Sequence, residues 1–142
     1  KIVIFSNYNN PLSMLMNKIL KNNIKAVFIH GDVELLDRHR LVYNFKNDDN
    51  ITCLLCNSKI GGEGLTLTEA STIIFLNEWW NPSSNRQAED RINRIGQKEK
   101  MKIYLLRSIN TIDTHVVDIL ESKHALEKDF LLALSNKVTN YA

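Results

Sequence analysis

The first 29 residues, KIVIFSNYNNPLSMLMNKILKNNIKAVFI, decide the fold class because they run from strand to helix to strand. Residues 1–6 form a short β-branched run that predicts a buried strand. Pro11 then stands where the first turn of a helix accepts proline. Apolar residues follow at the spacing of one helix face: Leu12, Leu15, Met16, Ile19 and Leu20. Residues 26–29 form the second predicted strand.

The same alternation continues to the end of the chain. Further strands are predicted at residues 51–56, 72–76 and 101–106. Between them, helices are predicted over residues 35–45, from Pro82 to about Ile95 with Gly96 as the C-cap, and over residues 111–136. Short apolar strands without in–out alternation are typical of a parallel sheet buried on both faces. We therefore predict an α/β fold whose ligands bind at the loops after the strands: residues 6–10, 30–33, 57–65 and 77–81.

Length and composition indicate one globular domain. The 142 residues are 44% hydrophobic and carry a net charge of +2, which only weakly favours a nucleic-acid partner. No apolar run approaches the roughly 20 residues of a membrane span, and no signal peptide is recognisable. Two cysteines cannot form a disulfide framework, so we expect an intracellular, reducing compartment. Because the chain begins directly on a strand, we expect it to be part of a longer polypeptide.

A glycine cluster, Gly61-Gly62-Glu63-Gly64, directly follows a predicted strand. Glycines let the backbone approach a phosphate or a ribose, and consecutive amides can point at an anion. The alternative is a tight turn after a strand. No G-x-x-x-x-G-K-[ST] segment occurs in the chain, so the usual phosphate-binding loop of ATPases is absent.

A second candidate is the segment from Gln87 to Gln97, QAEDRINRIGQ. On a continuous helix, Gln87, Arg91 and Arg94 would share one stripe beside an apolar stripe. Guanidinium groups suit a phosphoryl group whose negative charge spreads in a transition state. The alternative is a solvated helix face with local pairs.

Other motifs carry weaker signals. Adjacent tryptophans, Trp79 and Trp80, could stack on a nucleic-acid strand or simply pack in the core. Cys53 and Cys56 have C-x-x-C spacing but lie in a predicted strand, where residues three apart point to opposite faces, so we expect no metal site. The four histidines are scattered and match no catalytic spacing.

Taken in order, these segments resemble the C-terminal lobe of Swi/Snf-like ATPases, within the superfamily II helicases. Residues 1–6 look like the motif IV strand, and His30-Gly31-Asp32 with Arg38 looks like the G-x(6)-R segment. Residues 61–68 look like motif V, and Trp80-Asn81-Pro82 matches W-N-P. Residues 87–97 match motif VI, Q-A-x-D-R-x-x-R-I-G-Q, at every fixed position. The resemblance covers nearly the whole chain.

The resemblance implies a RecA-like lobe at residues 1–110 and a brace helix at residues 111–142, with the N-terminal ATP-binding lobe outside this chain. It implies ATP and Mg²⁺ held mainly by that missing lobe, double-stranded DNA or nucleoprotein as partner, no membrane contact, and a place in the nucleus or another site of DNA metabolism. By resemblance, Arg91 and Arg94 reach the γ-phosphate. The implied ATP-cleft residues are Gly62, Gly64 and Gln87, and the implied nucleic-acid contacts are Ser6, Gly31, Arg38, Gly61, Thr68 and Trp80.

The chain departs from the family pattern at three positions. Thr66 stands where many members have asparagine, Ile60 where many have alanine, and Asn77 where an acidic residue is frequent. These departures concern how close the chain is to any one subfamily, and they do not affect the resemblance to the family. Two rival functions stay open: an RNA helicase lobe, and a non-catalytic module that binds nucleic acid or protein. In either motor reading, the isolated chain is expected to show no ATPase activity.

Overall fold

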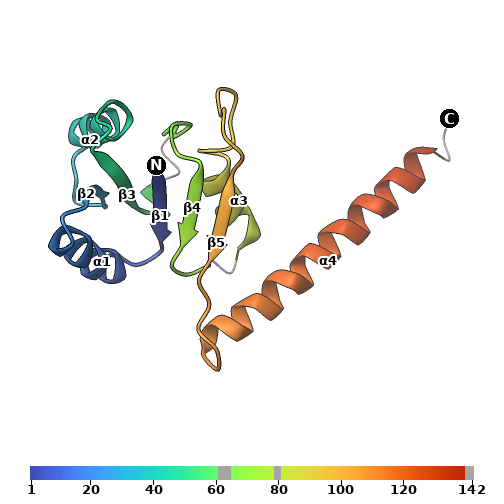
Figure 1. The fold of residues 1–142 in the computed structure, drawn as a ribbon. Helices are drawn as coiled ribbons and strands as arrows, with labels where there is room; N and C mark the ends of the chain where they lie inside the picture. The colour runs from blue at the N-terminus through green and yellow to red at the C-terminus, as the bar shows by residue number, and fades with distance from the viewer. Residues whose placement is uncertain (61–64, 79–80, 140–142) are drawn as a thin grey trace.

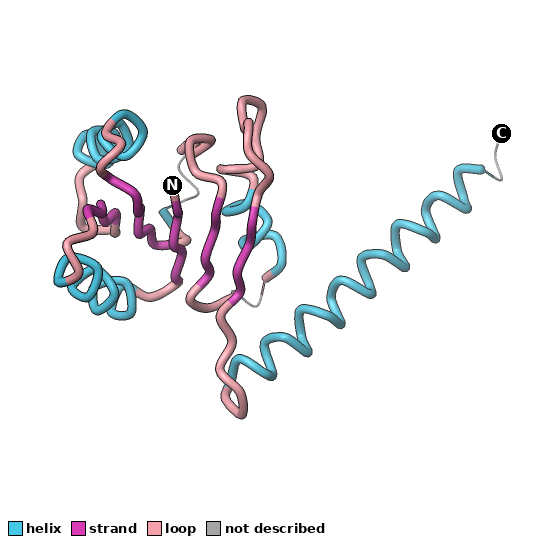
Figure 2. The backbone as a smooth tube through the Cα atoms, viewed as in Figure 1, coloured by secondary structure: helices cyan, strands magenta, loops and turns pink. Residues whose placement is uncertain are grey.

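The computed structural model describes residues 1–60, 65–78 and 81–139. Strands and helices alternate along most of the chain, as the apolar pattern predicts. In order they are β1 (Ile2–Ser6), α1 (Asn9–Lys21), β2 (Lys25–Ile29), α2 (Leu35–Asn47), β3 (Ile51–Asn57), β4 (Thr72–Phe75), α3 (Pro82–Glu89), β5 (Lys102–Leu105) and α4 (Ile112–Thr139). Figures 1 and 2 show the strands as one sheet with helices on its sides.

The sheet is parallel throughout, with the strand order β2-β3-β1-β4-β5 (Figure 1). The predicted α/β fold with a parallel sheet is therefore confirmed. From central β1 the chain crosses through α1 toward β2, whereas from β4 it continues to β5 at the opposite edge. Connections leave β1 and β4 in opposite directions, which makes a topological switch point at their carboxyl ends. Ligand sites of open α/β sheets occur at such a point.

Two apolar clusters hold the sheet between its helices. On one face, Val3 and Phe5 of β1 pack with Phe45 of α2, and the segment after β3 joins them. On the other face, Ile4 of β1 packs with Leu12 of α1. Alternate residues of the same strand thus enter different clusters, as strand geometry requires. The central strands are buried on both faces.

The edge strand β5 differs from the sequence prediction. All four of its residues are exposed, including Ile103, Tyr104 and Leu105. It is the edge strand next to β4, and its Leu105 lines an open hollow together with residues of α3 and α4. The apolar run thus predicts the strand correctly, but the expectation that its residues are buried is wrong.

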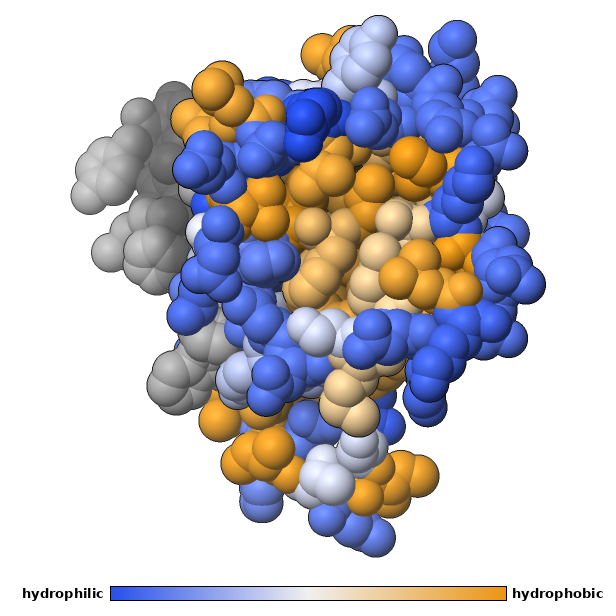
Figure 3. Space-filling view, turned by 90° about the vertical axis from the view of Figure 1, so that its left-hand side faces the viewer, coloured by the Kyte–Doolittle hydropathy of each residue, from blue (hydrophilic) through white to orange (hydrophobic). Residues whose placement is uncertain are grey.

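The opposite edge of the sheet is formed by β2. Figure 3 views the molecule from the side of α1, β2 and α2, and an apolar surface lies there within a hydrophilic rim. Exposed apolar side chains of these segments include Leu20, Ile24 and Leu35. The described residues thus leave this edge of the sheet partly uncovered.

The predicted last helix is present as α4, which leaves the sheet at an angle and extends away from it (Figures 1 and 2). Its start is fixed by local bonds: Thr111 Oγ1 accepts the N–H of Asp113 at 3.2 Å, and the Asp113 carboxylate accepts the N–H of Ser108 at 2.9 Å. Leu120 is buried, whereas Ile119 and Leu126 are exposed. Leu120 therefore anchors the first part of α4, whereas neighbouring apolar side chains before and after it stay exposed.

The helix predicted from Pro82 to Ile95 is shorter than expected. Its start is confirmed, with Pro82 in the first turn and Asn81 as N-cap accepting the N–H of Ser83 at 3.2 Å. However, α3 ends at Glu89, and turns follow to Gly96. Gly96 has φ 109° and so occupies a turn that favours glycine, without capping the helix. The expected helical stripe of Gln87, Arg91 and Arg94 does not exist.

Candidate functional site

A polar network joins the carboxyl ends of β1 and β4 at the switch point. Ser6 is fully buried, and its hydroxyl donates to Asn77 Oδ1 at 2.7 Å. The same oxygen accepts the N–H of Asn7 at 3.2 Å, and Ser6 Oγ accepts the N–H of Tyr8 at 3.1 Å. Because Ser6 and Asn77 are both uncharged, the network is neutral. Ser6 supports the loop after β1 from within and does not reach the surface.

A second amide extends this network to β3. Asn57 is 8% exposed, and its Nδ2 donates to Asn9 Oδ1 at 2.7 Å and to the Asn7 carbonyl at 3.4 Å. Its Oδ1 accepts the N–H of Lys59 at 3.0 Å. A buried polar side chain needs such partners, and here one side chain satisfies three groups from two strand ends. The loops after β1 and β3 are thereby fixed against each other.

The loop after β2 is held by Arg38. Its Nε donates to the Val33 carbonyl at 2.7 Å, and its Nη2 donates to the Gly31 carbonyl at 3.0 Å. The spacing of Gly31 and Arg38 therefore has a structural explanation, because the guanidinium closes the loop that contains the glycine. A Cβ at Gly31 would meet no described atom within 4 Å, so crowding by the described residues does not require glycine here.

Among the hollows along this edge of the sheet, two neighbouring ones share the side chains of Asn7 and Lys59. The larger one has a volume of about 450 Å³ and is lined by Asn7, Tyr8, Asn9, Asn10, Gly31, Asn57, Lys59 and Ile60. A smaller one of about 130 Å³ is lined by Asn7, Ser58, Lys59, Ser84 and Gln87. Asn7 and Lys59 line both. The predicted loops after β1, β2 and β3 thus meet at one place, together with the start of α3.

The turns after α3 pack onto the segment that precedes β4. Ile92 is fully buried in the cluster that also contains Leu67. The N–H of Leu67 donates to the Arg91 carbonyl at 2.9 Å. Arg91 itself is half-buried. The packing of Ile92 and this backbone bond therefore hold the turns that carry Arg91 and Arg94, where a continuing helix was expected.

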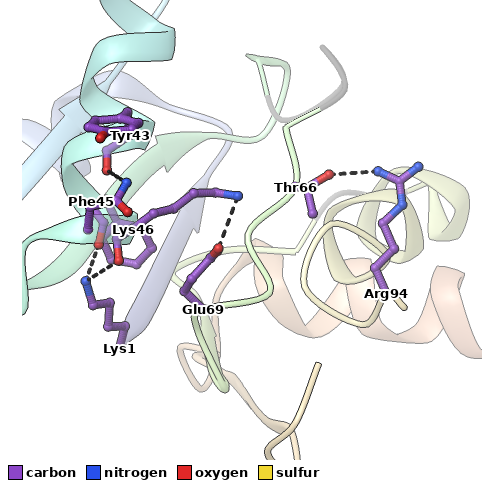
Figure 4. Close-up of polar contacts among 8 residues, drawn as sticks. Lys1, Tyr43, Phe45, Lys46, Thr66, Glu69 and Arg94 are labelled. Carbon is purple, nitrogen blue, oxygen red and sulfur yellow. Dashed lines mark hydrogen bonds and ion pairs between the residues drawn. The ribbon is translucent and has the colours of Figure 1, made fainter. Parts of the chain in front are cut away.

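Arg94 is exposed, and its Nη1 donates to Thr66 Oγ1 at 3.0 Å (Figure 4). Gln97 Nε2 donates to the Ala70 carbonyl at 2.6 Å. The end of the arginine-bearing turns is thus bonded to residues 65–70, the segment that also contains Thr66. Glu69 of this segment pairs with Lys46 of α2 at 3.3 Å (Figure 4). Residues 65–70 therefore connect α2 with the arginine-bearing turns.

Electrostatic features of α3 lie close by. Burial raises the pKa of Glu89, with a further contribution from Asp90 and a partial opposing effect of Arg86. Glu78 is largely buried and pairs with Arg107 Nε at 2.6 Å, which raises the pKa of Arg107. This ion pair links the end of β4 to the segment that leads into α4.

The structure brings together some of the predicted site residues and separates others. Gln87 lies on the smaller hollow with Asn7 and Lys59, and Gly31 lies on the larger one. Thr68 is half-buried in the segment that Arg94 contacts. Predicted residues outside the described ones are Gly61, Gly62, Gly64 and Trp80.

Sequence reasoning missed several residues of this edge. Asn57 and Lys59 stood inside a predicted loop without a recognisable motif, and Asn77 and Thr66 were noticed only as departures from a family pattern. Their partners lie far away in the sequence: Ser6 and Asn77 are 71 positions apart. Asparagine is common throughout the chain, so only the fold singles out the structural ones.

Both cysteines are buried, and they lie in the two different core clusters on opposite faces of the sheet. The expectation that the C-x-x-C spacing falls on opposite faces is confirmed. Within the described residues, no group of three histidine, cysteine or acidic side chains could hold a metal ion. Over the same residues, no helix is both long and apolar enough to cross a bilayer.

Comparisons with known proteins agree with this architecture. Residues 1–96 match the family model of the helicase conserved C-terminal domain. The chain is 34% identical over 126 residues to the yeast TATA-binding protein-associated factor MOT1, covering 87% of this chain and 7% of that protein. It is 33% identical over 128 residues to the human lymphoid-specific helicase, covering 90% of this chain and 15% of that protein.

A solved structure supports the same assignment. The C-terminal part of the Fun30 ATPase domain matches with a TM-score of 0.81 and 28% identity, over 84% of this chain and 38% of that chain. The chain thus spans a small part of the curated relatives it matches. On the family match and these likenesses, it belongs to the helicase conserved C-terminal domain family, as a C-terminal lobe of the Swi/Snf-like ATPases of superfamily II.

Proposed function

We propose that this chain is the second motor lobe of an ATP-dependent DNA translocase of the remodelling type, and that it contributes arginine to the ATP cleft and backbone contacts to DNA. The observation that carries the proposal is the linkage of Arg94 to Thr66. It connects the turns that bear the arginines with the segment following the glycine cluster. The names of the relatives, among them a lymphoid-specific helicase, support a helicase-like motor.

The role of the arginines follows from their chemistry and exposure. A guanidinium has five donors, and the bond to Thr66 uses one N–H of Arg94. The remaining donors of this exposed side chain suit an oxyanion brought to the lobe from outside. Arg91 is half-buried and belongs to the same turns, so we propose that it adds positive potential to this cleft. Gly62 and Gly64 complete our proposed cleft, although both lie outside the described residues.

ATP with Mg²⁺, bound mainly by the first lobe, would supply the anhydride bond whose hydrolysis releases free energy for movement. Arg94 and Arg91 would stabilise the negative charge that develops at the far side of the cleft when the lobes close. Related NTPases gain roughly a thousandfold or more in turnover from such an arginine. This lobe alone has no phosphate-binding loop in its sequence, so we expect the isolated chain to be inactive.

DNA would lie along the edge formed by the loops after the strands. Gly31 and Thr68, with Gly61 and Trp80, are the proposed backbone contacts. Gly31 is exposed, and the absence of a Cβ leaves room for a ligand there. Ser6 and Arg38 act indirectly in this proposal, because their polar groups already bond to Asn77 and to the loop carbonyls.

The C-terminal part has a separate role in the proposal. Residues 1–110 form the lobe, and residues 111–142 form a brace that reaches the first lobe of the same polypeptide. The exposed apolar side chains of α4, Ile119 and Leu126, support a docking partner for this helix. Relatives that are transcription factors or chromatin-remodelling proteins by name support action on nuclear DNA or nucleoprotein.

The test is ATP hydrolysis by the complete protein without nucleic acid, with duplex DNA, and with single-stranded RNA. Arg94→Ala should lower DNA-stimulated turnover by about a thousandfold while leaving DNA affinity nearly unchanged. Arg40→Ala is the matched control, because Arg40 is an exposed arginine of α2 that pairs with Asp37. Normal turnover in Arg94→Ala would refute the assignment of the arginine.

The same assay separates the rival functions. Stimulation by RNA and not by duplex DNA would indicate an RNA helicase. No hydrolysis by the complete wild-type protein under any condition would favour a binding module.

A further inference from the structure

Gln97 is half-buried within a stretch of exposed residues. Residues 93–96 and 98–100 are exposed on either side of it. Ile95 does not anchor this stretch, because its side chain is fully exposed. After the buried Ile92, Gln97 is thus the next side chain that turns inward.

Both polar groups of the Gln97 amide have partners. Its Nε2 donates to the carbonyl of the fully buried Ala70 at 2.6 Å and approaches the Ile92 carbonyl at 3.5 Å. Its Oε1 accepts the N–H of Glu99 at 2.8 Å. One amide therefore links the arginine-bearing turns, residues 65–70 and the chain that leads to β5. Removing the donor would leave a buried carbonyl without this partner, which is unfavourable.

The backbone of Gln97 closes the turn that begins at Arg94. Its N–H donates to the Arg94 carbonyl at 3.0 Å, so residues 94–97 form a β-turn. Gly96 is the third residue of this turn and has φ 109°, a conformation that favours glycine. Arg94 is the first residue and Gln97 the last. A side-chain bond at the last residue therefore holds the turn that carries the arginine.

The arginine-bearing turns are bonded to residues 65–70 at every third position. The bond at Arg91 is made by its backbone carbonyl, and the bond at Arg94 joins its guanidinium to Thr66. The third is the bond of Gln97. The first does not depend on the side chain, and the second uses the group that would meet the phosphate. Gln97 is thus suited to hold the turn without taking part in the reaction.

We propose that Gln97 is a positioning residue for ATP hydrolysis, which fixes the turn of residues 94–97 and thereby the place of Arg94. The inference rests on the proposed function and deepens it, because it names the group that holds the arginine. In this role Gln97 contacts neither ATP nor DNA. Its effect on the reaction passes through Arg94.

The experiment measures ATP hydrolysis by the complete protein with saturating duplex DNA. Gln97→Met keeps a side chain of similar length and removes both polar groups. It should lower kcat about ten- to hundredfold, because a small displacement of a stabilising group is costly in the transition state. The KM for ATP and the dissociation constant for DNA should change less than about twofold, since ground-state binding is retained.

Two further variants separate the parts of this device. Gln97→Glu keeps an acceptor for the N–H of Glu99, but its carboxylate cannot donate to the Ala70 carbonyl, so kcat should fall as well. Gly96→Ala opposes the positive φ of the turn and should lower kcat with the same unchanged KM. Each tests the turn if Gln97→Met does not fold.

A double variant tests whether the effect passes through Arg94. In the Arg94→Ala protein, Gln97→Met should lower the single-turnover rate of hydrolysis less than about twofold further, because the group that it positions is gone. A role independent of the arginine would instead multiply the two losses.

The controls address neighbouring surface and lost stability. Asn93→Ala changes an exposed residue of the same turns and should keep the wild-type kcat. Ile19→Val removes a buried methyl group from α1, in the core cluster on the other face of the sheet. It should lower the urea midpoint of unfolding and leave kcat unchanged, so a loss of stability alone would not imitate the effect.

Three outcomes would overturn the proposal. They are a wild-type kcat in folded Gln97→Met, a change confined to KM, and losses that multiply in the double variant. Absence of DNA-stimulated hydrolysis by wild-type protein, or normal turnover in Arg94→Ala, would instead refute the proposed function. The two failures are therefore distinguishable.

Discussion

The clearest prediction compares two isoleucines of the segment after α3. Ile92 is fully buried beside Leu67, whereas Ile95 is fully exposed three positions later. A continuous helix from Pro82 to Ile95 would have placed both on one apolar stripe. The structure therefore predicts opposite results for the same substitution at the two positions.

Ile92→Ala should lower the free energy of unfolding by about 2–5 kcal/mol, because it removes buried methyl groups and leaves a cavity. With a urea dependence of about 2 kcal/mol per molar, the unfolding midpoint should fall by roughly 1–2.5 M. Ile95→Ala should change the free energy of unfolding by less than about 0.5 kcal/mol. Ile92→Val should cost about 0.5–1.5 kcal/mol, as a smaller loss at the same site.

The assay is equilibrium urea unfolding of the 142-residue chain, followed by far-ultraviolet circular dichroism and tryptophan fluorescence in parallel. Agreement of the two probes checks that a single transition is measured. An equal cost for Ile92→Ala and Ile95→Ala would refute the turn after Glu89. It would favour the continuous helix that the apolar spacing predicts.

Two further predictions concern the same region. Thr66→Val in the complete protein removes the acceptor for Arg94 Nη1 and should lower kcat for DNA-stimulated ATP hydrolysis about two- to tenfold, whereas Thr66→Ser keeps the hydroxyl and should retain most of it. Steady-state kinetics would reveal this, and equal activity of the valine and serine variants would show that the bond does not position the arginine. Because burial raises the pKa of Glu89, its ionised form destabilises the fold above that pKa, and Glu89→Gln should be more stable than wild type at neutral pH. The difference should shrink as the pH falls through the raised pKa of Glu89 and vanish below the usual carboxyl range, as urea unfolding at several pH values would show; a pH-independent difference would contradict the electrostatic origin.

Local sequence patterns were sufficient for the strands, the order of the elements and the family. Runs such as residues 1–6 are short, apolar and separated by helical spacing, and only a buried parallel sheet accommodates that alternation. The segment from Gln87 to Gln97 carries a specific order of residues, and this order is visible without any fold. Both properties are local, so one chain is enough to reveal them.

The geometry of the site could not be predicted in this way. Ser6 with Asn77, Asn57 with Asn9, and Thr66 with Arg94 are contacts between distant segments, and no spacing along the chain encodes them. Several of these residues are asparagines in a chain where asparagine is frequent, so composition concealed them.

The end of α3 shows the same division. The sequence by itself determined that Pro82 begins a helix and that an arginine-rich motif follows. The tertiary structure alone decided that the helix ends at Glu89, because Ile92 packs into the core and the Arg91 carbonyl accepts the N–H of Leu67. Helical spacing shows only that a segment could bury one apolar face as a helix. Whether the helix continues depends on the free energy of packing against segments that are distant in the sequence.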